Sequence, residues 1–139
     1  MLDEKEYEKW FNTGRRNVSS AREDLGRGDY SWACFKAQQA AEVAVKALLH
    51  GLGLPAYGHS ISRLLKGLEA KGVKIDDDLM YSAKSLDKLY VPTRYPNAWA
   101  EGTPYDYYTK KDAENAINDA EKILQWVEDM WRYLKRGKG

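Results

Sequence analysis

The chain has one cysteine, Cys34, among its 139 residues. A single thiol excludes an internal disulfide and a cysteine-rich zinc site, and it fits a reducing compartment, so we expect a cytoplasmic protein. No apolar run approaches the ~18 residues that cross a bilayer, and the first residues hold no apolar signal core. We therefore expect neither a membrane segment nor a secretion signal.

The chain also lacks an excess of one charge, because its 22 Lys and Arg residues are nearly balanced by 21 Asp and Glu residues, which gives a formal net charge of +1. This balance excludes a global field that attracts DNA or RNA, while a local basic patch stays open, so nucleic-acid binding is undecided. Hydrophobic residues at 43% and charged residues at 31% exclude wholesale disorder. At this length we expect one domain over residues 1–139.

Motifs that hold phosphates or metals are missing. The sequence has no Gly-x-x-x-x-Gly-Lys loop, no Gly-x-Gly-x-x-Gly fingerprint and no glycine–serine loop leading to paired aspartates, as nucleotidyltransferases have. The run Asp76-Asp77-Asp78 suits the start of a helix, where acids complement the positive end of the dipole, better than a metal site. We expect no metal and no cofactor, and any nucleotidyl transfer would belong to a partner chain.

Apolar residues recur at helical spacing along most of the chain. One stripe runs from Tyr7 to Leu25, a second predicted helix covers residues 30–49 with Asp29 as its N-cap, and the last covers residues 109–135. Two shorter helices are expected between these, over residues 61–68 and from the aspartate run to the prolines at 92 and 96. No convincing alternating segment appears. The pattern predicts an all-α, up-and-down antiparallel bundle of about five helices, three long and two shorter.

The second predicted helix carries a narrow ridge of small side chains, which lets another helix approach closely, either within the chain or across a dimer seam. The ridge consists of Ala33, Ala37, Ala40, Ala44 and Ala47. The polar exceptions on this helix fall on one line, namely Gln38 or Gln39, then Glu42, then Lys46. They form either a polar cluster inside a cleft or a buried hydrogen-bond network that fixes the helix register.

A predicted loop over residues 91–108 places Arg94 among prolines and the aromatic residues Tyr90, Tyr95 and Trp99. Three interpretations stay open. The aromatic residues pack the loop, or Arg94 binds a phosphate while a base lies against Tyr95 or Trp99, or the segment is a protein–protein interface.

Several short motifs, taken in order, resemble the HEPN domain family. They are the run Ala37-Gln-Gln-Ala-Ala-Glu-Val-Ala-Val-Lys-Ala-Leu-Leu49, then Gly53, His59, Leu64-Leu65, Leu86-Asp-x-x-Tyr90, Arg94-Tyr-Pro96 and the helix around Ala120 to Trp126. The resemblance covers nearly the whole chain. It implies a compact helical bundle, a homodimer and a prokaryotic cytoplasmic protein. Members often pair with a small, separately encoded nucleotidyltransferase, and several such pairs behave as toxin–antitoxin modules.

Some HEPN proteins are metal-independent ribonucleases, which carry an arginine followed after about four to six residues by a histidine to stabilise phosphate charge and move protons. Here Arg94 is followed by Tyr-Pro-Asn-Ala-Trp-Ala-Glu, and no arginine stands at that spacing before His50 or His59. We therefore do not assign the family's ribonuclease activity to this chain, and we expect no catalytic residues.

The interpretation that these observations favour is a binding or accessory protein that binds a nucleotide and partners a nucleotidyltransferase. Its candidate ligand site consists of Gln39, Glu42, Lys46, His59, Tyr90, Arg94 and Tyr95. In this hypothesis Lys46 and Arg94 neutralise phosphate, and Tyr90 or Tyr95 supplies stacking or hydroxyl contacts. Two alternatives stay open: a divergent metal-independent ribonuclease that uses Arg94 with His59, and a structural dimeric interaction module.

Overall fold

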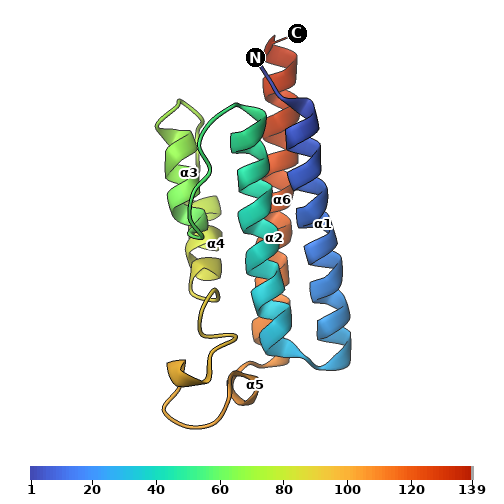
Figure 1. Cartoon of the computed structure of the whole chain (residues 1–139), viewed down its shortest axis with the longest axis vertical. Coiled ribbons are helices and arrows are strands. Elements are labelled where there is room, and N and C mark those ends of the chain that lie inside the picture. The colour runs from blue at the N-terminus through green and yellow to red at the C-terminus, as the bar shows by residue number, and fades with distance from the viewer. Residues whose placement is uncertain (139) are drawn as a thin grey trace.

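The computed structural model describes residues 1–138, and this part of the chain contains six α-helices, one short 3₁₀ turn and no strand. The three long helices, α1 (Glu4–Arg27), α2 (Tyr30–Gly51) and α6 (Lys110–Lys138), lie side by side, with both ends of the chain at one end of the bundle (Figure 1). The shorter helices α3 (Ile61–Glu69) and α4 (Asp77–Asp87) lie on the side of α2 away from α1. The predicted all-α bundle is confirmed.

The helices follow one another in the predicted order, but their directions do not simply alternate up and down. After α2 the chain doubles back, so that α3 begins beside the middle of α2 and runs parallel to it (Figure 1). The side-chain Nε2 of Gln38 marks this return, because it donates to the main-chain oxygen of His59 at 3.1 Å. The consequence is that His59 lies against the polar line of α2.

Helix ends reflect local capping chemistry. Asp76 accepts a hydrogen bond from the backbone nitrogen of Leu79 at 2.7 Å, so the predicted capping role of the aspartate run is confirmed. Gly28 follows α1 at φ 81°, a left-handed conformation that glycine adopts without strain. Asp29 occupies the N-cap position of α2 as predicted, yet its side chain makes no capping hydrogen bond. The predicted position of that cap is therefore confirmed.

The alanine ridge of α2 packs inside the molecule. All five alanines have no exposed surface, so they are unavailable as a dimer seam. On the facing helix, a Cβ placed at Gly14 of α1 would lie 3.0 Å from the carbonyl oxygen of Ala40. Small residues on both helices therefore allow the backbones of α1 and α2 to pack closely.

A second close approach joins three helices near the chain ends. The ring of Tyr7 stacks on Trp131 with centroids 4.2 Å apart and on Phe11 with centroids 5.3 Å apart. Gly51 completes this contact, because a Cβ there would lie 2.5 Å from the Trp131 ring. The helix α2 accordingly extends to Gly51, slightly beyond the predicted end.

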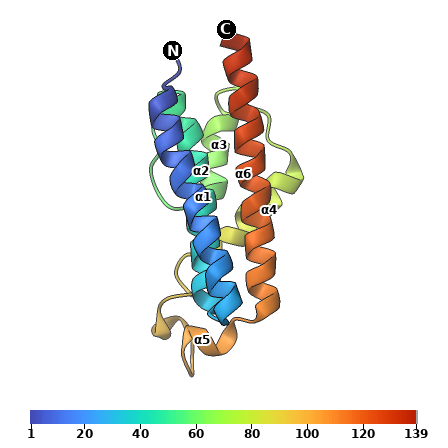
Figure 2. The same cartoon turned by 90° about the vertical axis from the view of Figure 1, so that its right-hand side faces the viewer.

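The predicted loop over residues 91–108 contains two small elements, η1 (Pro96–Ala98) and α5 (Pro104–Tyr107), at the end of the bundle opposite the termini (Figure 2). Thr103 and Asp106 form a capping box around α5. The indole nitrogen of Trp99 donates to the carbonyl of Pro92 at 2.8 Å, and its ring stacks on Tyr107 with centroids 4.1 Å apart. A four-residue helix is too short to show a periodic apolar pattern, so the sequence did not predict it.

Candidate functional site

The polar line of α2 forms a hydrogen-bond network centred on Glu42. The Glu42 residue is only 3% exposed. Its carboxylate accepts from Lys46 Nζ at 3.0 Å and from the side-chain nitrogens of Gln38 and Gln39 at 3.3 Å each. His59 Nδ1 lies 3.2 Å from the same carboxylate. The buried-network alternative therefore describes α2, and His59 connects that network to the surface.

Lys46 is committed to this network. It follows Glu42 by one helical turn, its side chain is 11% exposed, and its ammonium lies against the carboxylate. A buried pair of this kind compensates two desolvated charges. The Lys46 ammonium is thus paired with Glu42, and its side chain is much less exposed than that of His59.

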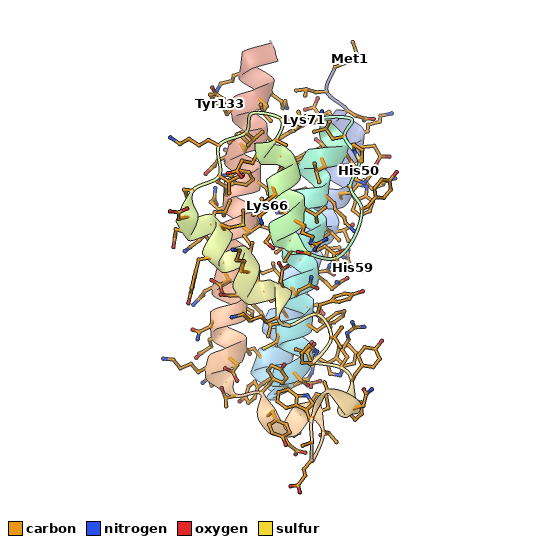
Figure 3. The ribbon with its side chains drawn as sticks, turned by 90° about the vertical axis from the view of Figure 1, so that its left-hand side faces the viewer. Met1, His50, His59, Lys66, Lys71 and Tyr133 are labelled. Carbon is orange, nitrogen blue, oxygen red and sulfur yellow. The ribbon has the colours of Figure 1, made fainter. Side chains whose placement is uncertain are left out.

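His59 is the exposed member, with 57% of its side chain accessible. Its ring stacks on Tyr90 with centroids 4.5 Å apart and planes 15° apart. Because Nδ1 faces the Glu42 carboxylate, Nε2 is the ring nitrogen left for a proton or a ligand. Figure 3 shows His59 in front of α2, at the foot of the segment that leads into α3.

Asp87, the last residue of α4, fixes the segments that carry His59 and Tyr90. Its carboxylate accepts from the backbone nitrogens of Ile61 at 2.6 Å and Ser62 at 3.2 Å, and from the hydroxyls of Ser60 at 3.0 Å and Ser62 at 2.6 Å. The sequence analysis missed this residue. An acid at the C-terminal end of a helix opposes that helix's own dipole, and this was the available signal that it caps another helix.

Arg94 lies among three aromatic rings. Its guanidinium carbon is 4.0 Å from the ring centroid of Phe35, 4.8 Å from that of Tyr90 and 5.0 Å from that of Tyr95. Its Nε and one terminal nitrogen donate to the carbonyl of Tyr90 at 3.1 and 2.7 Å. No ion pair within residues 1–138 involves Arg94. Across that range its charge is therefore held in place without a carboxylate partner.

The structure brings the predicted site residues together. We call this group the Arg94–His59 site, and it consists of Gln39, Glu42, Lys46, His59, Tyr90, Arg94 and Tyr95. Two neighbours were missed, namely Phe35 and Asp87. Gln38, which the sequence offered as an alternative to Gln39 on the polar line, joins the network as well. Trp99, a predicted stacking candidate, packs instead inside its own loop.

Three further observations concern the described residues. Residues 1–138 contain no group of three or more His, Cys, Asp or Glu side chains that could hold a metal ion. Within the same range no helix is both long and apolar enough to cross a membrane. Cys34 is fully buried, and burial raises the pKa of its thiol to about 12.

The fold and the sequence both match one family. The HEPN domain model matches residues 7–130, and the chain therefore belongs to the HEPN domain family. Its similarity to solved structures is high over nearly the full length. The chain is 47% identical to TT1696 from Thermus thermophilus, with a TM-score of 0.86, covering 88% of this chain and 96% of that one.

Two other relatives extend the comparison. ST0689, an archaeal HEPN homologue, is 43% identical with a TM-score of 0.76, covering 89% of this chain and 96% of that one. A Methanocaldococcus jannaschii protein named "Putative toxin MJ1304" is 29% identical over 143 residues, covering 96% of this chain and 91% of its own length.

Proposed function

We propose that this protein is a binding component of a toxin–antitoxin-like system that holds the phosphate of a nucleotide at the Arg94–His59 site. The observation that carries the proposal is the placement of Arg94, whose guanidinium is ordered by three rings and a carbonyl yet has no carboxylate partner among residues 1–138. Membership of the HEPN family and the toxin name of one relative support the biological setting.

Phosphate suits this arrangement because the guanidinium is already fixed. Two of its nitrogens donate to the Tyr90 carbonyl, so a phosphate oxygen would be met by the remaining donors without ordering a flexible side chain. His59 stacks on the same Tyr90 ring that the Arg94 guanidinium contacts. Tyr95, 48% exposed, offers a ring face for a base. Lys46, Glu42 and Gln39 act behind them by holding His59.

The proposal includes a protein partner. This chain lacks the glycine–serine loop and paired aspartates of nucleotidyl transfer, so we assign that chemistry to a separately encoded nucleotidyltransferase. Exposed hydrophobic residues lie close to the site, either in sequence or by contact, namely Trp32, Val91 and Tyr95. Tryptophan and tyrosine are enriched at protein–protein interfaces, so these side chains suit a surface that a partner covers. Co-purification with the neighbouring gene product tests this part, and light scattering tests the proposed homodimer.

Isothermal titration with ATP, GTP and AMP tests nucleotide binding. We expect saturable binding below millimolar concentration, weakened at least about tenfold by Arg94→Ala, as for loss of a charge-assisted hydrogen bond. Arg63→Ala, which removes an exposed arginine of α3, is the matched control and should leave affinity unchanged. No binding at millimolar nucleotide, or equal affinity of the Arg94→Ala variant, would show the assignment to be wrong.

One observation favours a second function, the divergent metal-independent ribonuclease. A buried carboxylate that orients a histidine through Nδ1, as Glu42 does here, is the arrangement that general acid–base catalysis uses. A fluorogenic RNA assay in the presence of EDTA separates the two functions. Cleavage that His59→Ala abolishes would establish the ribonuclease, whereas nucleotide binding without cleavage would leave the binding function alone.

A further inference from the structure

We propose that a cavity beside the loop 91–108, between α4 and the first turns of α6, binds a guanidinium group. The cavity has a volume of about 510 Å³. Its walls include Trp99, Tyr107 and Tyr108 from the loop region and Asp112, Asn115 and Asp119 from α6. None of these residues belongs to the Arg94–His59 site, so this proposal stands independently of the proposed function.

The aromatic wall is a fixed corner. Trp99 and Tyr107 stack with planes 12° apart, and Tyr108 stands at 89° to the Trp99 ring with centroids 5.7 Å apart. The hydrogen bond from the Trp99 indole nitrogen to the Pro92 carbonyl holds this arrangement. Faces of Trp and Tyr attract cations through the ring quadrupole, and the planar guanidinium also stacks on them.

The polar wall is acidic. One face of α6 supplies this wall at three- and four-residue spacing, through Asp112, Asn115 and Asp119. No lysine or arginine of residues 1–138 lines the cavity. One oxygen of Asp119 accepts from the Ser82 hydroxyl at 3.0 Å, and the other remains for a ligand. Lys122, close by on α6, pairs at 2.8 Å with Asp78. The lining thus carries negative charge that a cation would neutralise and that a phosphate would meet unfavourably.

The burial of Asp119 also favours a bound cation. Burial raises the pKa of the Asp119 carboxyl, which means that the ionised form is poorly solvated in the free protein. A bound cation would stabilise that ionised form. A metal ion is the poorer match, because the described residues offer no cluster of three carboxylate, imidazole or thiol ligands. Guanidinium donors instead match the carboxylate and amide oxygens, while the aromatic corner covers the flat face.

The experiment compares a charged ligand with its neutral isostere. We would titrate the protein with N-acetylarginine amide and N-acetylcitrulline amide, and then with a short arginine peptide and its citrulline counterpart, by calorimetry and amide NMR. We expect saturable binding of the arginine compounds, at least tenfold tighter than that of the citrulline compounds. Free arginine, titrated beside them, separates the two sources: tighter binding of free arginine indicates a small molecule, and tighter binding of the capped amide and the peptide indicates the side chain of a partner protein.

Two variants and a second readout locate the site. Asp119→Asn and Trp99→Leu should weaken arginine binding at least tenfold, whereas Asp129→Asn, an exposed carboxylate elsewhere on α6, should not. Binding should also lower the pKa of Asp119 measured by carboxyl NMR. Three results would overturn the proposal: equal binding of citrulline, no saturation at about 20 mM arginine amide, or wild-type affinity in a folded Asp119→Asn variant.

Discussion

His59 and Tyr90 stack face to face with ring centroids 4.5 Å apart, although one precedes α3 and the other follows α4. The contact depends on how the two short helices pack, and Asp87 is the side chain that joins them. The exposed part of the Arg94–His59 site is therefore built from segments that α2 alone cannot position.

Removal of the Asp87 carboxylate should loosen this arrangement. Asp87→Ala leaves the start of α3 without its tertiary cap, and we expect the free energy of unfolding to fall by about 2–3 kcal/mol, since several charge-assisted hydrogen bonds are lost. Urea denaturation measures the change, and NMR shifts of the His59 ring report the loss of stacking. Lys88→Ala, at the exposed neighbouring position, should cost less than about 0.5 kcal/mol. Equal stabilities of the two variants would contradict this role.

The Glu42–Lys46 pair should behave as a buried charge pair. Glu42→Ala leaves the Lys46 ammonium buried without its partner, and we expect a loss of about 3–5 kcal/mol. The double variant Glu42→Met with Lys46→Met removes both charges and should regain most of that loss. Denaturant unfolding of the three proteins tests the idea. A double variant as unstable as the single one would show that hydrogen bonding or shape, and not charge compensation, dominates there.

Gly51 should not tolerate a side chain. Its Cβ would lie 2.5 Å from the Trp131 ring, and overpacking of this kind costs about 1–3 kcal/mol, so Gly51→Ala should lower the melting temperature. Gly67 of α3 provides the matched control, because a Cβ there meets nothing within 4 Å. Gly67→Ala should raise stability by about 0.5–1 kcal/mol through helix propensity. A melting temperature raised by both substitutions would mean that Trp131 moves aside freely.

Cys34 should make stability fall at alkaline pH. Burial raises the pKa of its thiol to about 12, above the value near 8.5 expected in an unfolded chain. The stabilising contribution is complete below the unfolded pKa and is lost as pH rises toward the folded pKa, at about 1.4 kcal/mol per pH unit. Denaturant unfolding of the wild type and Cys34→Ala between about pH 8 and about pH 10.5 isolates the effect. A constant difference between the two proteins across this range would exclude it.

Much of the fold could be predicted because its signals are local. Apolar residues that recur at three- and four-residue spacing predicted the long helices. The aspartate at position 76 caps α4, as its place before an apolar stripe predicts. The short helix α5 was not predicted, because four residues do not display a helical period. The capping box of Thr103 and Asp106 was the local sign of it.

The candidate site was predictable as a set of residues but not as a geometry. The polar line through Glu42 and Lys46 stands out on an otherwise apolar helix, and Arg94 stands out among aromatic residues. Nothing local indicated that Lys46 would be enclosed while His59 stays exposed. His59 reaches Glu42 from a separate segment, whose main chain returns to α2 and accepts a hydrogen bond from Gln38, and no local pattern in the sequence indicates that return.

The sequence by itself determined the class of fold, the absence of a disulfide and the residues that gather at the site, since these depend on periodicity, composition and residue type. Tertiary structure alone decided which groups share a surface. The stacking of His59 on Tyr90, the enclosure of Lys46 and the aromatic corner beside Asp119 each depend on residues far apart in the chain. Their meeting depends on how helices and loops pack, and packing is a property of the whole molecule that no local pattern encodes.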